Sequence, residues 1–75
     1  MTKEQLRELL SSYVEDEMDT IADDENLIYA GLDSMMVMSI VEELRTRGIL
    51  VNFLEFLEQP SIEAWLEKIH IYTTV

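Results

Sequence analysis

The sequence contains no cysteine and only one histidine, His70, which limits the chemistry open to its side chains. Without cysteine there is no disulfide, thiolate nucleophile or cysteine-ligated zinc, and one histidine excludes a multi-histidine metal site. Serine catalysis needs a base near the hydroxyl, and we expect His70 to be a surface or core-edge residue instead. The 75 residues are sufficient for one small domain, residues 1–75, without an enclosed catalytic cavity. We therefore expect that the chain is not an enzyme.

Long hydrophobic runs and a signal peptide are also missing from the sequence. No apolar stretch approaches the roughly 20 residues that span a bilayer. Met1 is followed by a charged, helix-like stretch, unlike a secretory signal. The hydrophobic fraction of 48% and the mean hydropathy of +0.02 are ordinary for a folded globular chain. We expect a cytoplasmic monomer that binds no membrane.

Basic residues are scarce, with 5 Lys and Arg against 16 Asp and Glu, so the net charge is −11. The segment 8–44 contains no base, and the acids outside it are matched in number by the five bases. Such a charge repels nucleic acid, and it serves either as a solubilising surface or as a docking surface for basic partners. The eleven acids of this segment are Glu8, Glu15, Asp16, Glu17, Asp19, Asp23, Asp24, Glu25, Asp33, Glu42 and Glu43.

The N-terminal stretch predicts a first helix. Thr2 is a suitable N-cap, and Gln5 three residues later completes a capping-box pattern. The acidic run at 15–17 is unfavourable near the negative end of a helix dipole, so we expect the helix to end near Met18. Its apolar face follows the helical period and consists of Leu6, Leu9, Leu10, Tyr13 and Val14.

A long connection, residues 19–33, follows this helix. Connections of this length are uncommon in compact domains and are often functional. Its acids lack the spacing and the glycine of an EF-hand loop, so we expect no metal site. Gly31 permits a turn where a side chain would clash. The residues predicted to anchor the loop on the core are Leu27, Ile28, Tyr29 and Leu32.

Three further helices are predicted. The second begins at Asp33 or Ser34 and runs to about Thr46 before Gly48, and a short third helix covers residues 51–57. The fourth follows Pro60 and is capped by Ser61. The buried faces of the second and fourth helices are predicted to be Val37, Ile40, Val41, Leu44, Ile62, Trp65, Leu66 and Ile69. The expected fold class is all-α, a small four-helix bundle with a long first loop and a short third helix.

The start of the second helix places Asp33 and Ser34 on an exposed turn. Free backbone N–H groups and the positive end of the helix dipole make this a suitable place for a phosphate diester on the serine oxygen. A plain helix cap is the other interpretation of the same two residues. Met35 is predicted to point to water, and Met36 and Met38 flank the buried stripe. Exposed methionines favour an adaptable contact surface.

Residues 24–35, Asp-Glu-Asn-Leu-Ile-Tyr-Ala-Gly-Leu-Asp-Ser-Met, resemble the phosphopantetheine-carrying family of acyl, peptidyl and aryl carrier proteins. The resemblance extends over about residues 2–71 and includes the order of the helices. It implies that a phosphopantetheinyl transferase attaches 4'-phosphopantetheine from coenzyme A to Ser34, which Asp33 helps to present. The arm would supply the missing thiol, and cargo would travel on it as a thioester. The implied contacts with partners are Met35, Met36, Met38, Glu42 and Glu43.

Within that family, the Gly-Leu-Asp-Ser motif, the methionine-rich second helix and the segment 59–65 are similar to aryl carriers of nonribosomal siderophore assembly. This implies an adenylating or acyltransferase loading enzyme and a condensation or other downstream domain as partners. Phe53 and Phe56 are candidate contacts for the downstream partner, with burial in the core as the equal alternative. An aminoacyl or polyketide cargo stays open. The alternative class is a non-enzymatic acidic helical adaptor without a prosthetic group.

Overall fold

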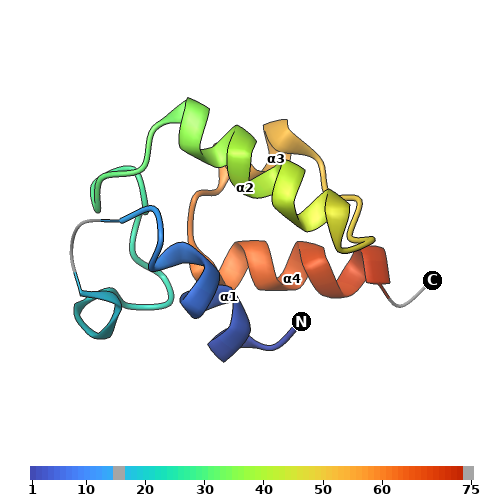
Figure 1. Cartoon of the computed structure of the whole chain (residues 1–75). Helices are drawn as coiled ribbons and strands as arrows, with labels where there is room; N and C mark the ends of the chain where they lie inside the picture. Colours follow the sequence, from blue (N-terminus) through green and yellow to red (C-terminus); the bar gives the residue numbers. More distant parts are fainter. Residues whose placement is uncertain (15–16, 74–75) are drawn as a thin grey trace.

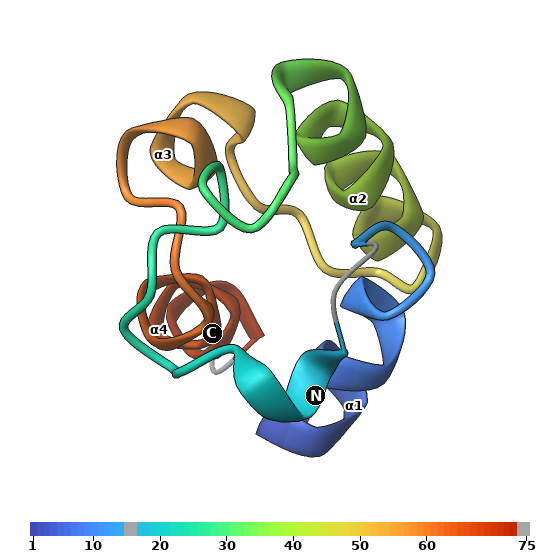
Figure 2. The ribbon, with the colours of Figure 1, turned by 90° about the vertical axis from the view of Figure 1, so that its left-hand side faces the viewer.

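A computed structural model of the chain describes residues 1–14 and 17–73, and in these ranges it is all-helical (Figure 1). The predicted fold class is confirmed. A 3-10 helix, η1 (Met18–Thr20), lies in the long connection between the first two α-helices. Figure 2 shows the four α-helices arranged around a common centre. They are α1 (Lys3–Leu10), α2 (Ser34–Thr46), α3 (Phe53–Glu58) and α4 (Ile62–Thr73).

The core is formed by apolar side chains from every α-helix and from the long connection. The predicted buried stripe of α2 is confirmed, and in α4 only Leu66 is half-buried rather than buried. Trp65 of α4 stacks on Phe56 of α3, with ring centroids 4.6 Å apart and an angle of 13° between the planes. The indole N–H also donates to the Phe56 carbonyl at 2.9 Å. Phe56 is therefore a core residue, and this pair fixes α3 against α4.

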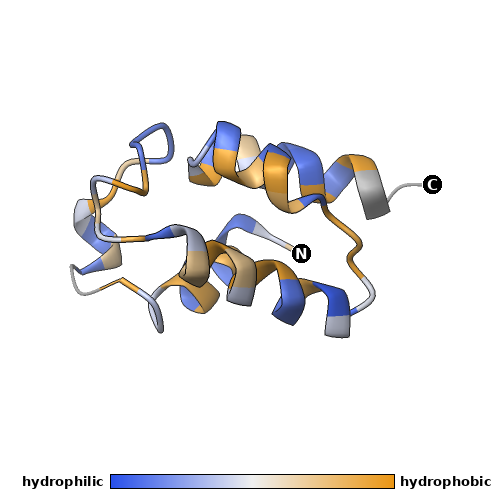
Figure 3. Ribbon diagram, turned by 90° about the horizontal axis from the view of Figure 1, so that it is seen from above, coloured by the Kyte–Doolittle hydropathy of each residue, from blue (hydrophilic) through white to orange (hydrophobic). Residues whose placement is uncertain are grey.

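Each α-helix carries both hydrophobic and hydrophilic residues along its length, as the bands of colour in Figure 3 show. This pattern is what an amphipathic helix on the surface of a small core requires. The predicted capping box of α1 is confirmed, with the Gln5 N–H donating to the Thr2 hydroxyl at 3.2 Å. The Asn52 side chain caps α3, which begins at Phe53 rather than at the predicted Val51. No N-cap was predicted for this helix, although asparagine is a common N-cap.

The prediction that α1 continues to about Met18 is wrong, because the helix ends at Leu10. The Ser11 hydroxyl donates to the Glu8 carbonyl at 2.6 Å, and such local bonds compete with the helical ones. The N–H groups of residues 13 and 14 then both turn back to the Leu10 carbonyl. Two of the three acids that predicted the later end, at positions 15 and 16, lie outside the described residues.

One arginine holds the first half of the long connection against α1. The Arg7 guanidinium donates to the carbonyls of Met18 and Ile21, each at 2.9 Å, and pairs with the Asp23 carboxylate. Lys3 adds a second ion pair to Asp23 at 3.1 Å. We call this group of bonds the Arg7 clamp. It satisfies two loop carbonyls in the place of water, which is how an irregular segment stays ordered beside a core.

The same connection is also bound to the beginning of α4. The Asp23 carbonyl accepts from the Glu63 N–H at 2.9 Å, and the Leu27 N–H donates to the Pro60 carbonyl at 2.6 Å. Figure 2 shows this stretch running past α4 and α3 before the chain reaches α2. The loop is therefore fixed on both sides before it delivers the chain to the start of α2.

Two of the four residues predicted to anchor this loop do so, and two do not. Leu27 and Leu32 are buried, whereas Ile28 is 39% and Tyr29 is 87% exposed. Residues 26–31 form a series of tight turns, in which no regular period tells which side chain faces the core. Gly31 occupies the left-handed region with φ of 111°, as its predicted turn requires. Ala30 and Ile21, which the sequence analysis overlooked, are buried in addition.

The Arg7 clamp predicts a specific pH dependence of stability. The hydrogen bonds from Arg7 and Lys3 hold the pKa of Asp23 below its ordinary value of 3.8. A lowered folded-state pKa contributes stability above the unfolded pKa, and this stability is lost as the pH falls through the folded pKa. Asp23→Asn is therefore expected to be less stable than the wild type at neutral pH, by an amount that shrinks below pH 3.8. Urea unfolding followed by circular dichroism at several pH values measures this difference.

Asp24→Asn is the matched control, because Asp24 is exposed and forms no ion pair with the other described residues. Its unfolding free energy should follow that of the wild type across the same pH series. A difference between wild type and Asp23→Asn that stays constant into the acid range would contradict the role of the clamp.

Candidate functional site

The start of α2 is built by Asp33 and Ser34. Asp33 is the N-cap, with extended backbone angles of −120° and 176°, and its carboxylate accepts from the Met36 N–H at 2.8 Å. Ser34 is the first helical residue, and both side chains are exposed. The helix ends after Thr46, close to Gly48, which has a positive φ of 83°. Both predicted ends of this helix are confirmed.

The Ser34 hydroxyl is not used to build the helix. Because the Asp33 carboxylate caps α2, the serine oxygen takes part in none of the side-chain hydrogen bonds found among the described residues. The first turn of a helix still presents backbone N–H groups without intrahelical partners, together with the positive end of the dipole. Asp33 therefore caps the helix, and its neighbour Ser34 is the candidate attachment site. An exposed, uncommitted hydroxyl at this place fits a phosphate diester.

Two buried leucines position this turn. Leu32, which precedes the cap, is buried and donates its N–H to the Leu27 carbonyl at 3.1 Å. Leu27 is itself fully buried and is bound to Pro60 through its own N–H. The chain therefore enters α2 from a point that is fixed in the core, while Ser34 stays at the surface.

The methionines predicted to contact partners differ in the exposed fraction of their side chains. Met35 is 78% exposed, which confirms that it points to water, and Met38 is 53% exposed. Met36 is half-buried and packs against the core, as does Phe53 at the start of α3. Two exposed leucines near α3, Leu50 at 63% and Leu54 at 61%, were missed by the sequence analysis. For Leu54 the available signal was the helical period, which places it on the opposite side of α3 from the buried Phe56, whereas Leu50 precedes the helix.

The two predicted acidic contacts on α2 have different environments. The Glu42 side chain is 64% exposed, with its carboxylate 4.0 Å from Arg45. Glu43 accepts from the Tyr13 hydroxyl at 3.3 Å, and this bond connects α2 to the segment after α1. Glu43 also pairs with Arg47 at 3.4 Å. Burial, followed by the charge and the hydrogen bond of Glu43, raises the pKa of Tyr13. Glu42 is the more accessible of the two carboxylates.

The acidic segment 8–44 is partly neutralised in three dimensions. Although it contains no base, four of the five bases of the chain form ion pairs with its carboxylates. Lys3 and Arg7 reach it from α1, and Arg45 and Arg47 from the end of α2. The remaining base, Lys68, lies 3.9 Å from Glu55. Most of the described acids of this segment that have no such partner lie in the long connection, and the full set is Glu8, Glu17, Asp19, Asp24, Glu25 and Asp33.

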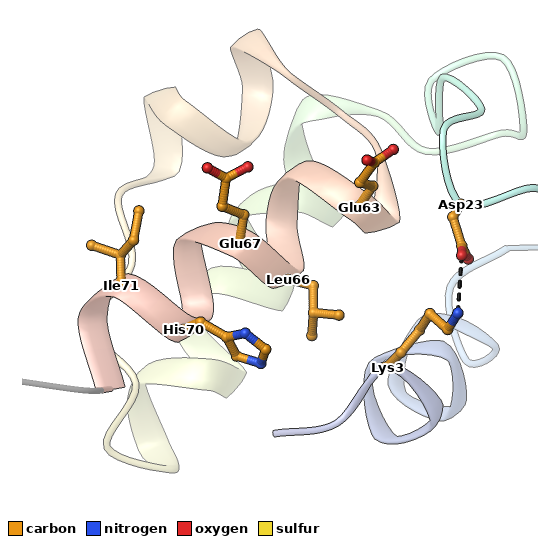
Figure 4. A pocket seen from close by; sticks show the side chains of 7 residues that line it. All are labelled: Lys3, Asp23, Glu63, Leu66, Glu67, His70 and Ile71. Atoms are coloured by element: carbon orange, nitrogen blue, oxygen red, sulfur yellow. Dashed lines mark hydrogen bonds and ion pairs between the residues drawn. The ribbon is translucent and has the colours of Figure 1, made fainter.

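A pocket of about 580 Å³ lies between the start of α1 and the outer face of α4 (Figure 4). None of its lining residues belongs to α2, so it is separate from Ser34. Its acid Asp23 is held by Lys3, as the dashed line in Figure 4 shows. In the described part of the chain, no group of three or more His, Cys, Asp or Glu could hold a metal ion. The lining consists of Lys3, Asp23, Glu63, Leu66, Glu67, His70 and Ile71.

The chain is a small helical bundle with an exposed serine at the first residue of α2. This is the architecture of a carrier protein domain. Residues 4–69 match the family described as "Phosphopantetheine attachment site". The chain belongs to this family, with phosphopantetheine as its cofactor, and it is a carrier domain. The resemblance identified in the sequence is thereby confirmed. None of the described helices has the length and apolar character needed to cross a membrane.

Several curated proteins are similar to the chain. An isochorismatase of Bacillus subtilis is 38% identical over 64 residues, which cover 85% of this chain and 20% of that protein. Pyochelin synthetase PchE of Pseudomonas aeruginosa is 39% identical over 64 residues, or 85% of this chain and 4% of that protein. Acyl carrier protein ScoB of Streptomyces coeruleorubidus is 32% identical over 65 residues, covering 87% and 76% of the two chains. The chain thus spans a small part of the first two relatives and most of the third.

The exposure of Met35 predicts that a charge at this position is tolerated by the fold. Met35→Asp should keep the helical circular dichroism of the wild type and change its unfolding free energy by less than about 1 kcal/mol. Val37→Asp, two residues further along α2, is the matched contrast, because Val37 is fully buried and an unpaired charge there should unfold the domain. Thermal unfolding of both variants measures this. Loss of structure in Met35→Asp would show that Met35 belongs to the core.

Proposed function

We propose that Ser34 is the residue to which phosphopantetheine is attached. The observation that carries this proposal is the exposed Ser34 hydroxyl at the first residue of α2, left uncommitted because Asp33 caps the helix. It lies inside the family match of residues 4–69. Asp33 has a positioning role, since its bond to Met36 holds the first turn in helical form.

The attachment is a transfer made by a separate phosphopantetheinyl transferase. The Ser34 oxygen forms a bond to the phosphorus that bears the pantetheine arm in coenzyme A. The bond from that phosphorus to the bridging oxygen breaks, adenosine bisphosphate leaves with the electron pair, and the serine proton passes to a base of the transferase. The first-turn N–H groups and the helix dipole favour the negative charge of the resulting diester. When attached, the group supplies the thiol on which cargo is held as a thioester.

In this proposal the chain is the carrier component of a multi-enzyme pathway and makes or breaks no bond in its cargo. Residues 1–75 form a single carrier domain that acts as a monomer in the cytoplasm. Its further partners are an adenylating or acyltransferase loading enzyme and a condensation or other downstream domain. Met35, Met38 and Glu42 are the accessible residues of α2 for these partners, while Met36, Glu43 and Phe53 contribute from half-buried positions.

An aryl group is the cargo that we propose. The sequence is similar to aryl carriers in the Gly-Leu-Asp-Ser motif and in the segment 59–65. The name phenyloxazoline synthase, carried by a relative from Mycolicibacterium paratuberculosis that is 36% identical over 66 residues, refers to a product with an aromatic ring. The acyl carrier protein among the relatives keeps an acyl or polyketide cargo as the second candidate.

Modification at Ser34 is tested by incubating the protein with coenzyme A and a broad-specificity phosphopantetheinyl transferase. We expect intact mass spectrometry to show a gain of one phosphopantetheine on the wild type and none on Ser34→Ala. Ser39→Ala is the matched control, because Ser39 is an exposed serine of the same helix, and this variant should be modified fully. A wild type that stays unmodified while folded would favour the adaptor without a prosthetic group.

The accessible carboxylate of Glu42 is expected to steer basic partners. Glu42→Lys should slow loading by the cognate enzyme about threefold or more at low ionic strength, and the difference should fade as salt screens the charges. Glu67→Lys makes the same change of charge on the exposed face of α4 and serves as the control. Equal loading rates for Glu42→Lys and wild type at low salt would contradict a steering role.

A further inference from the structure

The most exposed large hydrophobic side chain of the described residues is Tyr29, at 87%, and its neighbour Ile28 is 39% exposed. Both lie in an ordered turn. The Ile28 N–H donates to the Asn26 side chain at 2.9 Å, and the Tyr29 N–H donates to the Asn26 carbonyl at 3.1 Å. The turn therefore holds two apolar side chains outward in a defined conformation. We call this pair the loop tip.

The loop tip is continuous with the start of α2. Its base is closed by the bond from the Leu32 N–H to the Leu27 carbonyl, and Leu32 leads directly into the cap of α2. Tyr29 precedes Ser34 by five residues, so even a fully extended chain would separate them by about 18 Å at most. The closed turn shortens this span further.

The short distance between the loop tip and Ser34 indicates which partner contacts the loop tip. A protein–protein interface of standard size covers about 800 Å² on each partner, a patch with a radius of about 16 Å if it is circular. Because the closed turn brings the loop tip nearer to Ser34 than an extended chain would, the loop tip lies within reach of the rim of an enzyme whose active site is centred on the Ser34 hydroxyl. Tyrosine is enriched among the residues that carry most of the energy of an interface. A rigid turn also offers it at little cost in entropy.

We propose that Ile28 and Tyr29 form a docking element for the phosphopantetheinyl transferase that modifies Ser34. The transferase is the partner that must bring its reacting centre to the serine oxygen itself, whereas later partners meet the thiol at the far end of the arm. The loop tip follows the acids Asp24 and Glu25, so the complementary surface is an apolar recess with basic groups at its rim. This inference rests on the proposed attachment at Ser34.

The test measures the kinetics of Ser34 modification at varied concentrations of the carrier. Tyr29→Ser is expected to lower kcat/KM about tenfold, mainly through KM, because docking is weakened while the reacting hydroxyl is unchanged. Tyr29→Phe keeps the aromatic ring and should stay within about twofold of the wild type. Ile71→Ser is a control on the far end of α4, where Ile71 is 51% exposed, and it should have no effect.

The possible outcomes distinguish a failure of the docking role of the loop tip from a failure of the proposed attachment at Ser34. A wild type that gains no phosphopantetheine contradicts attachment at Ser34 and removes the basis of the inference. A modified wild type with an equal kcat/KM for Tyr29→Ser overturns the docking role alone. So does normal modification of Tyr29→Ser combined with slower loading, which would assign the loop tip to a later partner. Tyr29→Gln, which keeps the length of the side chain, decides the question if Tyr29→Ser loses its helical circular dichroism.

Discussion

The Arg7 clamp is the interaction on which the position of the site depends. A small helical bundle with a long connection between α1 and α2 has many backbone groups there that no α-helix satisfies. One guanidinium, itself only 25% exposed, binds two carbonyls and one carboxylate of that connection. Since Asp23 is also bonded to α4 through its carbonyl, the clamp joins α1, the loop and α4 in one group of contacts.

The site at the start of α2 follows from this arrangement. The connection is anchored at Asp23, at Leu27 and at Leu32, so the chain enters α2 in one direction only. Asp33 then takes the capping bond and leaves Ser34 uncommitted at the surface. A residue that both capped the helix and carried the prosthetic group would lose the capping bond on modification. Because Asp33 supplies the capping bond, a group attached to Ser34 would leave that bond in place.

The surface around Ser34 combines apolar side chains with negative charge. Tyr29 and Met35 are exposed on either side of the cap in sequence, and Glu42 lies further along the same helix. Exposed apolar groups supply binding energy once a partner has arrived, and charges act earlier by guiding its approach. The family match identifies phosphopantetheine as the cofactor, and these exposed residues are the partner contacts that we propose.

The sequence by itself determined the features that depend on near neighbours in the chain. The capping box of Thr2, the cap and first residue of α2, the turn at Gly31 and the buried stripe of α2 all rest on local hydrogen bonds or on a helical period. Tertiary structure alone decided the partner of Arg7, the burial of Phe56 against Trp65 and the outward direction of Tyr29. Each of these depends on contacts between distant residues, or on turns that have no period, and a linear pattern contains neither.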